Sequence, residues 1–74
     1  MIIYPNPSNH TIKFEIENKF NEDLLVQIIN YQGQVLLSNI QKNKELDISH
    51  LSKGSYIITV QSSQYFYSSQ FIKK

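Results

Sequence analysis

The residue types that most often carry catalysis or bind metal form two small groups in this chain. His10 and His50 are the only histidines, and Asp47 and Ser49 stand close to the second of them. Asp47, Ser49 and His50 are the residue types of a hydrolytic triad, but a triad needs side chains that converge from separate elements. These three lie at the end of one predicted strand, where successive side chains alternate in direction. A zinc site needs about three or four ligands, so we interpret both histidines as solvated turn residues.

Carboxylates form the second group, because paired carboxylates catalyse acid–base reactions when one of them is desolvated. Glu15 and Glu17 share one strand face, and Glu45 and Asp47 share another. Each pair alternates with apolar residues and is therefore expected to face solvent. The six acidic residues are dispersed, whereas a Ca²⁺ site gathers about six to eight oxygens. With no cysteine available for disulfides or thiolate sites, the sequence predicts no catalytic, metal or cofactor-binding residue and no enzyme.

Charge and length restrict the remaining function classes. The net charge is +1, the seven basic residues are all scattered lysines, and nucleic-acid-binding domains usually carry a clustered face rich in arginine. No stretch approaches the roughly 18 consecutive apolar residues of a membrane span. The N-terminus lacks the pattern of a signal peptide. The 74 residues are enough for a single domain. If it is exported, we expect its signal to lie elsewhere in a longer precursor.

Period-two alternation, which is typical of half-buried strands, runs through most of the chain. Residues 11–17 place Ile12, Phe14 and Ile16 on one face and charged residues on the other. Residues 23–30 form a nearly continuous apolar run, which is typical of a central strand. Further strands are predicted at residues 34–40, 45–48, 55–61 and 65–73. Six to seven short strands separated by turns predict an all-β fold, a small Ig-like antiparallel β-sandwich.

Both glycines and both prolines fall in three segments that separate these strands: residues 3–9, 30–33 and 51–56. Gly33 can adopt a positive φ without steric cost, which predicts a three-residue hairpin loop with a bulge at the glycine. Tyr56 is expected to pack its ring on the core and to bond nearby backbone through its hydroxyl, as the tyrosine corner of Ig-like domains does. Another loop is predicted at residues 18–22.

The run Tyr65, Phe66 and Tyr67 has two interpretations. In a strand the two tyrosines share one face and Phe66 lies on the other. We predict that Phe66 belongs to the core and that the tyrosines are half-buried at a sheet edge. The alternative is an exposed aromatic row that stacks on sugar rings. That arrangement would make the chain a carbohydrate-binding or adhesive module.

The order of these motifs resembles one bacterial family, the type A C-terminal sorting domains of proteins exported by the type IX secretion system of Bacteroidetes. Residues 3–9, IYPNPSN, look like the family's opening motif, and residues 26–35 look like its central strand–turn–strand. Residues 46–60 are similar to its most recognisable segment, and residues 71–74 resemble its apolar-then-basic ending. The chain departs from the family pattern at Gln70, where the family often has a lysine.

The resemblance implies that the chain is the address label of a cargo joined to its N-terminal side, and the last domain of a secreted precursor. The outer-membrane machinery reads such labels, a sortase-like peptidase typically removes them, and the cargo is secreted or joined to surface lipopolysaccharide. The label itself is no catalyst. Pro5 and Pro7 are expected to fix how the chain enters the sandwich and to separate cargo from label. The structural motif residues are Tyr4, Pro5, Asn6, Pro7, Asn30, Gly33, Leu51, Gly54 and Tyr56.

Recognition is expected at the C-terminal end of the chain. The exposed edge of the last strand could accept a strand from the receptor, with backbone bonds giving affinity and alternate side chains giving specificity. Our hypothesis is that this edge forms the recognised surface together with Phe71, Ile72, Lys73 and Lys74. Residues 56–60 are uncharged and favour β-structure, so weak self-association is expected if their strand is an unprotected edge.

Overall fold

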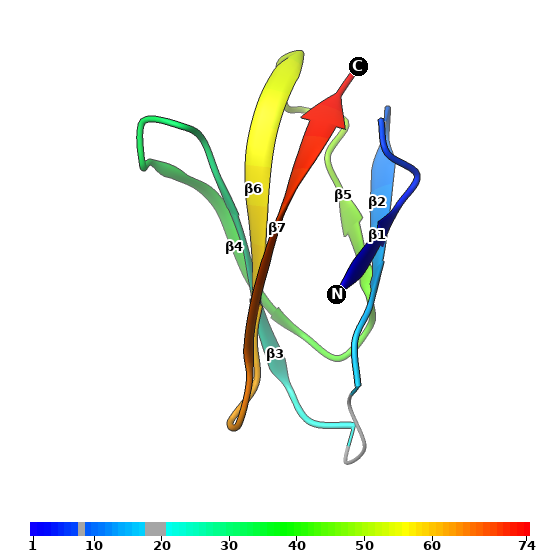
Figure 1. Ribbon diagram of the computed structural model, residues 1–74, viewed down its shortest axis with the longest axis vertical. Helices are drawn as coiled ribbons and strands as arrows, with labels where there is room; N and C mark the ends of the chain where they lie inside the picture. The colour runs from blue at the N-terminus through cyan, green and yellow to red at the C-terminus, as the bar shows by residue number, and fades with distance from the viewer. Residues whose placement is uncertain (8, 18–20) are drawn as a thin grey trace.

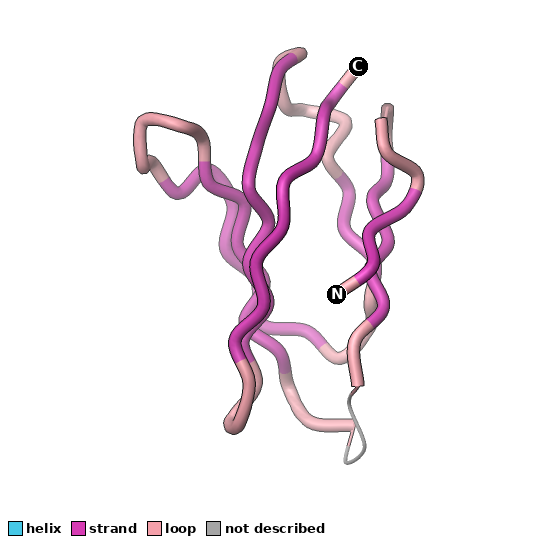
Figure 2. Tube along the Cα trace, viewed as in Figure 1, coloured by secondary structure: helices cyan, strands magenta, loops and turns pink. Residues whose placement is uncertain are grey.

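Seven β-strands make up the computed structural model, which describes residues 1–7, 9–17 and 21–74. The strands are β1 (Ile2–Tyr4), β2 (Thr11–Glu15), β3 (Leu24–Ile29), β4 (Val35–Gln41), β5 (Glu45–Asp47), β6 (Gly54–Gln61) and β7 (Phe66–Lys73). The described part of the chain contains strands and loops but no helix (Figure 2). The predicted all-β class is confirmed, at the upper end of the predicted number of strands.

Two antiparallel sheets face each other across a single core (Figure 1). The smaller sheet has the strand order β1-β2-β5, and the larger has the order β4-β3-β6-β7. β3 pairs with β4 on one side and with β6 on the other, so the long apolar run lies inside its sheet as predicted. The predicted sandwich is therefore confirmed, and β7 forms one edge of its larger sheet.

The core consists of alternate strand residues that point between the two sheets, together with Ile48, which directly follows β5. Removing one such aliphatic or aromatic side chain from water contributes about 1.5–3 kcal/mol, so these positions dominate the stability of a small domain. The buried apolar residues are Ile12, Phe14, Leu24, Val26, Ile28, Leu46, Ile48, Tyr56, Ile58, Val60 and Phe71. Among them, Phe14 and Phe71 have the largest fully buried side chains.

The hairpin between β3 and β4 has the predicted three-residue loop. Gly33 adopts a φ of +85°, and its N–H donates to the carbonyl of Asn30 at 3.0 Å. The Asn30 side chain adds a second layer of bonds, because its Oδ1 accepts the backbone N–H groups of Gln32 at 3.0 Å and Gln34 at 2.9 Å. A short polar side chain thus folds the turn around itself, as Asn commonly does in loops.

Several boundaries differ from the predicted strands. β1 is absent from the prediction because its residues stand directly before Pro5 and read as part of a turn. It forms because β2 offers a free edge, where Ile3 pairs with Phe14. β2 ends two residues earlier than predicted, and β4 extends to Gln41. Most of the loop predicted at residues 18–22 lies outside the described residues.

β6 is an interior strand, which bears on the expected self-association. Its residues pair with β3 on one side and with β7 on the other. The uncharged residues 56–60 are therefore covered on both edges, and the condition on which that expectation rested is not met there. The open edges of the larger sheet belong to β4 and β7.

Candidate recognition surface

Asp47, Ser49 and His50 form a turn at the end of β5. The Asp47 carboxylate accepts the backbone N–H of Ser49 at 2.9 Å. This bond, followed by one with the Ser49 hydroxyl, lowers the pKa of Asp47 below its usual value. His10 meets the same turn through its backbone carbonyl, which accepts the N–H of Ile48 at 2.8 Å. Within the described residues, no three His, Asp or Glu side chains are grouped so as to hold a metal ion.

β7 directs its odd-numbered residues toward the core and its even-numbered residues outward. Phe66 consequently lies outside, with 64% of its surface exposed, and the prediction that it belongs to the core is wrong. Tyr67 packs against the core, as expected of a half-buried tyrosine. Tyr65 lies beside it, with ring centroids 6.0 Å apart and ring planes inclined by 32°.

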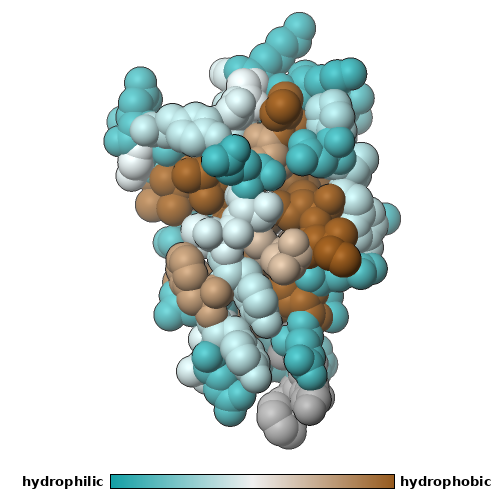
Figure 3. Space-filling view, in the orientation of Figure 1, coloured by the Kyte–Doolittle hydropathy of each residue, from teal (hydrophilic) through white to brown (hydrophobic). Residues whose placement is uncertain are grey.

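Exposed apolar side chains are distributed over several strands and loops. On the face shown in Figure 3, the apolar surface forms separate patches with polar side chains between them. Isolated exposed apolar residues are ordinary on small proteins. The large ones are Ile2, Tyr4, Tyr31, Val35, Leu36, Ile40, Tyr65, Phe66 and Ile72.

Tyr56 connects the turn before β6 to the C-terminal strand. Its hydroxyl donates to the backbone carbonyl of Ser52 at 2.6 Å, which confirms the predicted bond to nearby backbone. Its ring stacks on Phe71, with centroids 5.7 Å apart, and Leu51 packs against the same core. Residues 46–60, the most recognisable segment of the sequence, therefore pack against Phe71. Phe71 is the first residue of the C-terminal tail, which we define as residues 71–74.

The four tail residues divide into two pairs. Phe71 is 1% exposed and Lys73 is 8% exposed, because both point between the sheets. The Lys73 ammonium donates to the carbonyl of Lys74 at 3.1 Å. Ile72 is 51% exposed on the outer face, and Lys74 is exposed beyond the end of β7. An exposed apolar side chain and an exposed cation thus follow a buried aromatic anchor.

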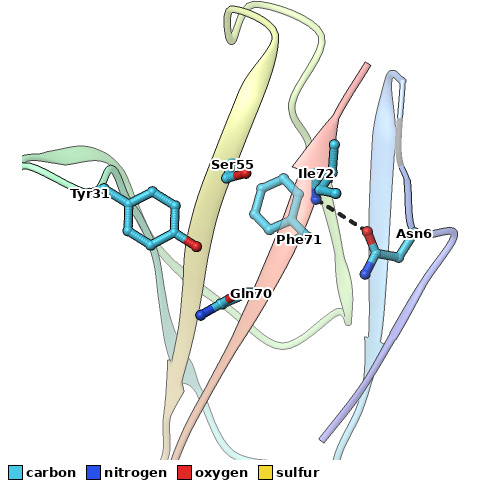
Figure 4. Close-up of a pocket in the computed structure, with 6 residues that line it drawn as sticks. All are labelled: Asn6, Tyr31, Ser55, Gln70, Phe71 and Ile72. Atoms are coloured by element: carbon cyan, nitrogen blue, oxygen red, sulfur yellow. Dashed lines mark hydrogen bonds between the residues drawn. The ribbon is translucent and has the colours of Figure 1, made fainter.

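Asn6 joins the opening motif to this tail. Its Oδ1 accepts the backbone N–H of Ile72 at 3.1 Å (Figure 4). The bond links positions 66 residues apart in sequence and connects the two sheets near the end of β7. Pro5 and Pro7 flank Asn6, and each proline ring restricts its own φ and the conformation of the residue before it. The prolines thereby limit the backbone conformations from which the Asn6 side chain reaches β7.

A shallow pocket of about 160 Å³ lies beside the same bond. In Figure 4, Gln70, Phe71 and Ile72 come from β7, Ser55 comes from the adjacent β6, and Tyr31 reaches toward them from the β3–β4 hairpin. Asn6 closes the opposite side. The pocket therefore brings the opening motif, the hairpin and the tail to one place, although Asn30 and Gly33 themselves remain in the hairpin loop.

The family model of secretion-system C-terminal sorting domains matches residues 2–74. The chain belongs to this family. No curated protein matches this chain. Sorting domains of this family are signals for type IX secretion, and the proteins that carry them are secreted or attached to the cell surface across the outer membrane.

Membership also defines the partners and the chemistry at a coarse level. The sorting domain is a signal that the type IX machinery recognises, attached to a cargo on its N-terminal side. Its family is not an enzymatic one. No helix in the described residues is long and apolar enough to cross a membrane.

Two features of the sorting domain's surface escape the sequence reasoning. The bond between Asn6 and Ile72 joins two motifs that look independent in the sequence, and only the closure of the sandwich brings them together. The outward direction of Phe66 follows from the phase of β7. The burial of Phe71 could have indicated that phase, since residues an odd number of positions apart in a strand lie on opposite faces.

Proposed function

We propose that the C-terminal tail and the adjoining edge of β7 are the surface that the type IX machinery reads. The observation that carries this proposal is the arrangement of the tail: Phe71 is fixed in the core, while Ile72 and Lys74 project outward. Family membership supplies the function, and the tail supplies an apolar and a cationic contact in a defined geometry.

The buried and exposed tail residues have different roles in this proposal. Phe71 and Lys73 hold the strand in register, because both are packed on the inner face of the sheet. Ile72 and Lys74 are read by the receptor. The pocket beside Ile72 offers a place for one side chain of the receptor, which is how recognition of an extended strand gains specificity.

The proposal extends to the fate of the precursor. The domain is the last one of a larger secreted precursor, and a sortase-like peptidase removes it from the cargo. Met1 and Lys74 are separated along the long axis of the sandwich (Figure 1), so a cargo joined at Met1 leaves the tail accessible. The domain itself carries out no reaction, in line with a family of signals.

The test is a fluorescent reporter fused to residues 1–74 and expressed in a host with an active type IX system. Replacing both exposed tail residues, Ile72→Ser with Lys74→Ser, is expected to lower the surface or secreted reporter about tenfold, equivalent to the loss of about 1.4 kcal/mol of recognition. The matched control is Ile40→Ser with Lys44→Ser, because both residues are exposed and lie in β4 and in the connection that follows it, on the opposite side of the larger sheet from β7. The amount of reporter on the surface is measured as the cell fluorescence that is lost when intact cells are treated with protease.

Thermal unfolding of the purified variants separates recognition from folding. Both double variants should unfold close to the temperature of the parent, because surface substitutions usually change stability by about 0.5 kcal/mol or less. If the tail variant and the control variant are secreted equally well, the assignment of the tail as the recognised surface is wrong.

A further inference from the structure

The open edge of β7 carries a defined set of backbone groups. In an antiparallel pair, alternate residues direct both their N–H and C=O groups toward the partner strand. At the β6–β7 turn, the N–H of Ser62 donates to the carbonyl of Tyr65, which fixes this alternation. Odd-numbered residues of β7 therefore bond to β6. The residues that direct their backbone groups away from β6 are Phe66, Ser68, Gln70 and Ile72.

The bond from Ile72 to Asn6 independently establishes the same phase. The N–H of Ile72 donates to the Asn6 side chain, in the loop between β1 and β2, so this N–H points away from β6. This leaves Phe66, Ser68 and Gln70 with backbone groups on the open edge. Among the described strands, none pairs with β7 on that side.

This stretch of edge lacks the devices that usually prevent strand addition. Natural edges are commonly protected by lysine, proline, a bulge or a covering loop. Residues 66–70 contain neither a charge nor a proline, and β7 pairs with β6 without any shift in register. The edge strand on the other side, β4, is different, because its register with β3 shifts between Ile28 and Ile29. A bulge of this kind bends the strand and makes further pairing harder.

We propose that an extended segment of the type IX machinery adds to the larger sheet as a fifth strand, paired with residues 66–70 of β7, and that Asn6 sets the end of this pairing site. The inference rests on the proposed function, since it names the way in which the β7 edge is read. The occupant is a segment of the machinery because the edge is continuous with the tail assigned to it. In backbone pairing, the main-chain hydrogen bonds supply affinity and depend little on the side chains of the edge strand.

The side chains beside the edge define the chemistry of the added segment. Phe66 is exposed at the start of the stretch and Ile72 is exposed just beyond its end, and polar Ser68 and Gln70 lie between them on the same outer face. The added strand is accordingly an uncharged one with apolar residues near its ends. Asn6 occupies the N–H of Ile72, so pairing of the added strand stops after Gln70.

The substitution that tests this site is Ser68→Pro. The N–H of Ser68 lies on the open edge, so proline removes an edge donor without removing a bond to β6, and proline is tolerated at such edge positions. The first control, Ser68→Ala, keeps the N–H. The second, Ser38→Pro, alters the opposite edge of the sheet. Ser38 pairs with Gln27, Gln27 pairs with Thr59, and Thr59 pairs with Ser68. The two serines therefore occupy equivalent positions on the two edge strands of the sheet, which makes this control closely matched.

Secretion of the fused reporter is expected to fall about tenfold for Ser68→Pro, as for the loss of about 1.4 kcal/mol of binding, and to stay unchanged for both controls. Equal secretion of Ser68→Pro and Ser68→Ala overturns strand pairing. If the tail variant Ile72→Ser/Lys74→Ser is poorly secreted in the same experiment, recognition of the tail stands and only strand pairing is rejected. If the tail variant is also secreted as well as the parent, both proposals are wrong.

Hydrogen exchange gives a second measurement that does not depend on a substitution. Binding of the parent domain to detergent-solubilised outer-membrane machinery should slow amide exchange at Ser68 and Gln70, and leave Ser38 unchanged. Unchanged exchange at Ser68 and Gln70 in the bound domain overturns the proposal. Protection that instead grows with the concentration of the domain alone, without machinery, overturns the proposed occupant in favour of a second copy of the chain.

Discussion

Replacing Phe71 by alanine is expected to lower the free energy of unfolding by about 3–5 kcal/mol, the usual cost of deleting a buried phenylalanine ring. The side chain is almost completely buried, and it stacks on Tyr56. A domain of 74 residues has a total stability of roughly 4–11 kcal/mol. The variant should therefore be partly or largely unfolded at 37 °C. Urea denaturation followed by circular dichroism measures the change.

Phe66 provides the matched control, because it is the same residue type in the same strand but faces outward. Phe66→Ala should change stability by about 0.5 kcal/mol or less. Similar losses for the two variants would contradict the observed phase of β7. A reporter fused to the Phe71→Ala domain should also fail to be secreted, and the denaturation data attribute that failure to unfolding.

Replacing Gly54 by alanine is expected to cost about 1–3 kcal/mol, because a side chain is forced into a sparsely populated backbone region. Gly54 begins β6 with a φ of +150°, a conformation that residues with a Cβ rarely adopt. Space is not the obstacle, since a Cβ built at Gly54 would meet no atom within 4 Å. The shift in the midpoint of urea denaturation measures the cost.

Ser55→Ala is the control for this substitution, because it changes the adjacent exposed strand residue without altering backbone preference. Its effect should stay within about 0.5 kcal/mol. An unaltered midpoint for Gly54→Ala would mean that the backbone at this turn relaxes freely. In that case, only Tyr56 and its bond to Ser52 would fix the direction in which the chain enters β6.

Much of this fold can be predicted from the sequence because its determinants are local. Alternation of Ile12 and Phe14 with charged residues is enough to place β2 and its buried face. The positive φ of Gly33 and the chemistry of Asn30 specify the hairpin between β3 and β4. The Tyr56 hydroxyl finds its partner only four residues away. Each of these features depends on neighbours along the chain.

The features that escape prediction depend on residues far apart in sequence. β1 forms only because β2 leaves an edge for it. Its three residues favour β-structure, but a run of three directly before a proline is too short to predict a strand. The phase of β7 is set by Phe71 in the core, and a run of three aromatic residues does not reveal which of them faces inward. The contact between Asn6 and Ile72 requires both sheets to be in place.

In the candidate surface too, the sequence indicates the segment, whereas the direction of each side chain depends on contacts with distant residues. The four residues of the tail are assigned to recognition as a unit on the basis of the sequence. In the structure, Phe71 and Lys73 lie on the inner face, while Ile72 and Lys74 are exposed. A deletion of the whole tail would therefore remove a core side chain together with the surface. Substitution of the two exposed residues is the cleaner experiment for this reason.

Site-specific photo-crosslinking tests most directly whether the machinery reads the tail. A benzophenone amino acid is placed at Ile72 or at Ile40, both exposed apolar positions on strands at opposite edges of the larger sheet, and cells secreting the reporter are irradiated. We predict a crosslink to an outer-membrane component of the secretion machinery from Ile72 and none from Ile40. A crosslink of equal yield from both positions, or from Ile40 alone, would contradict the account.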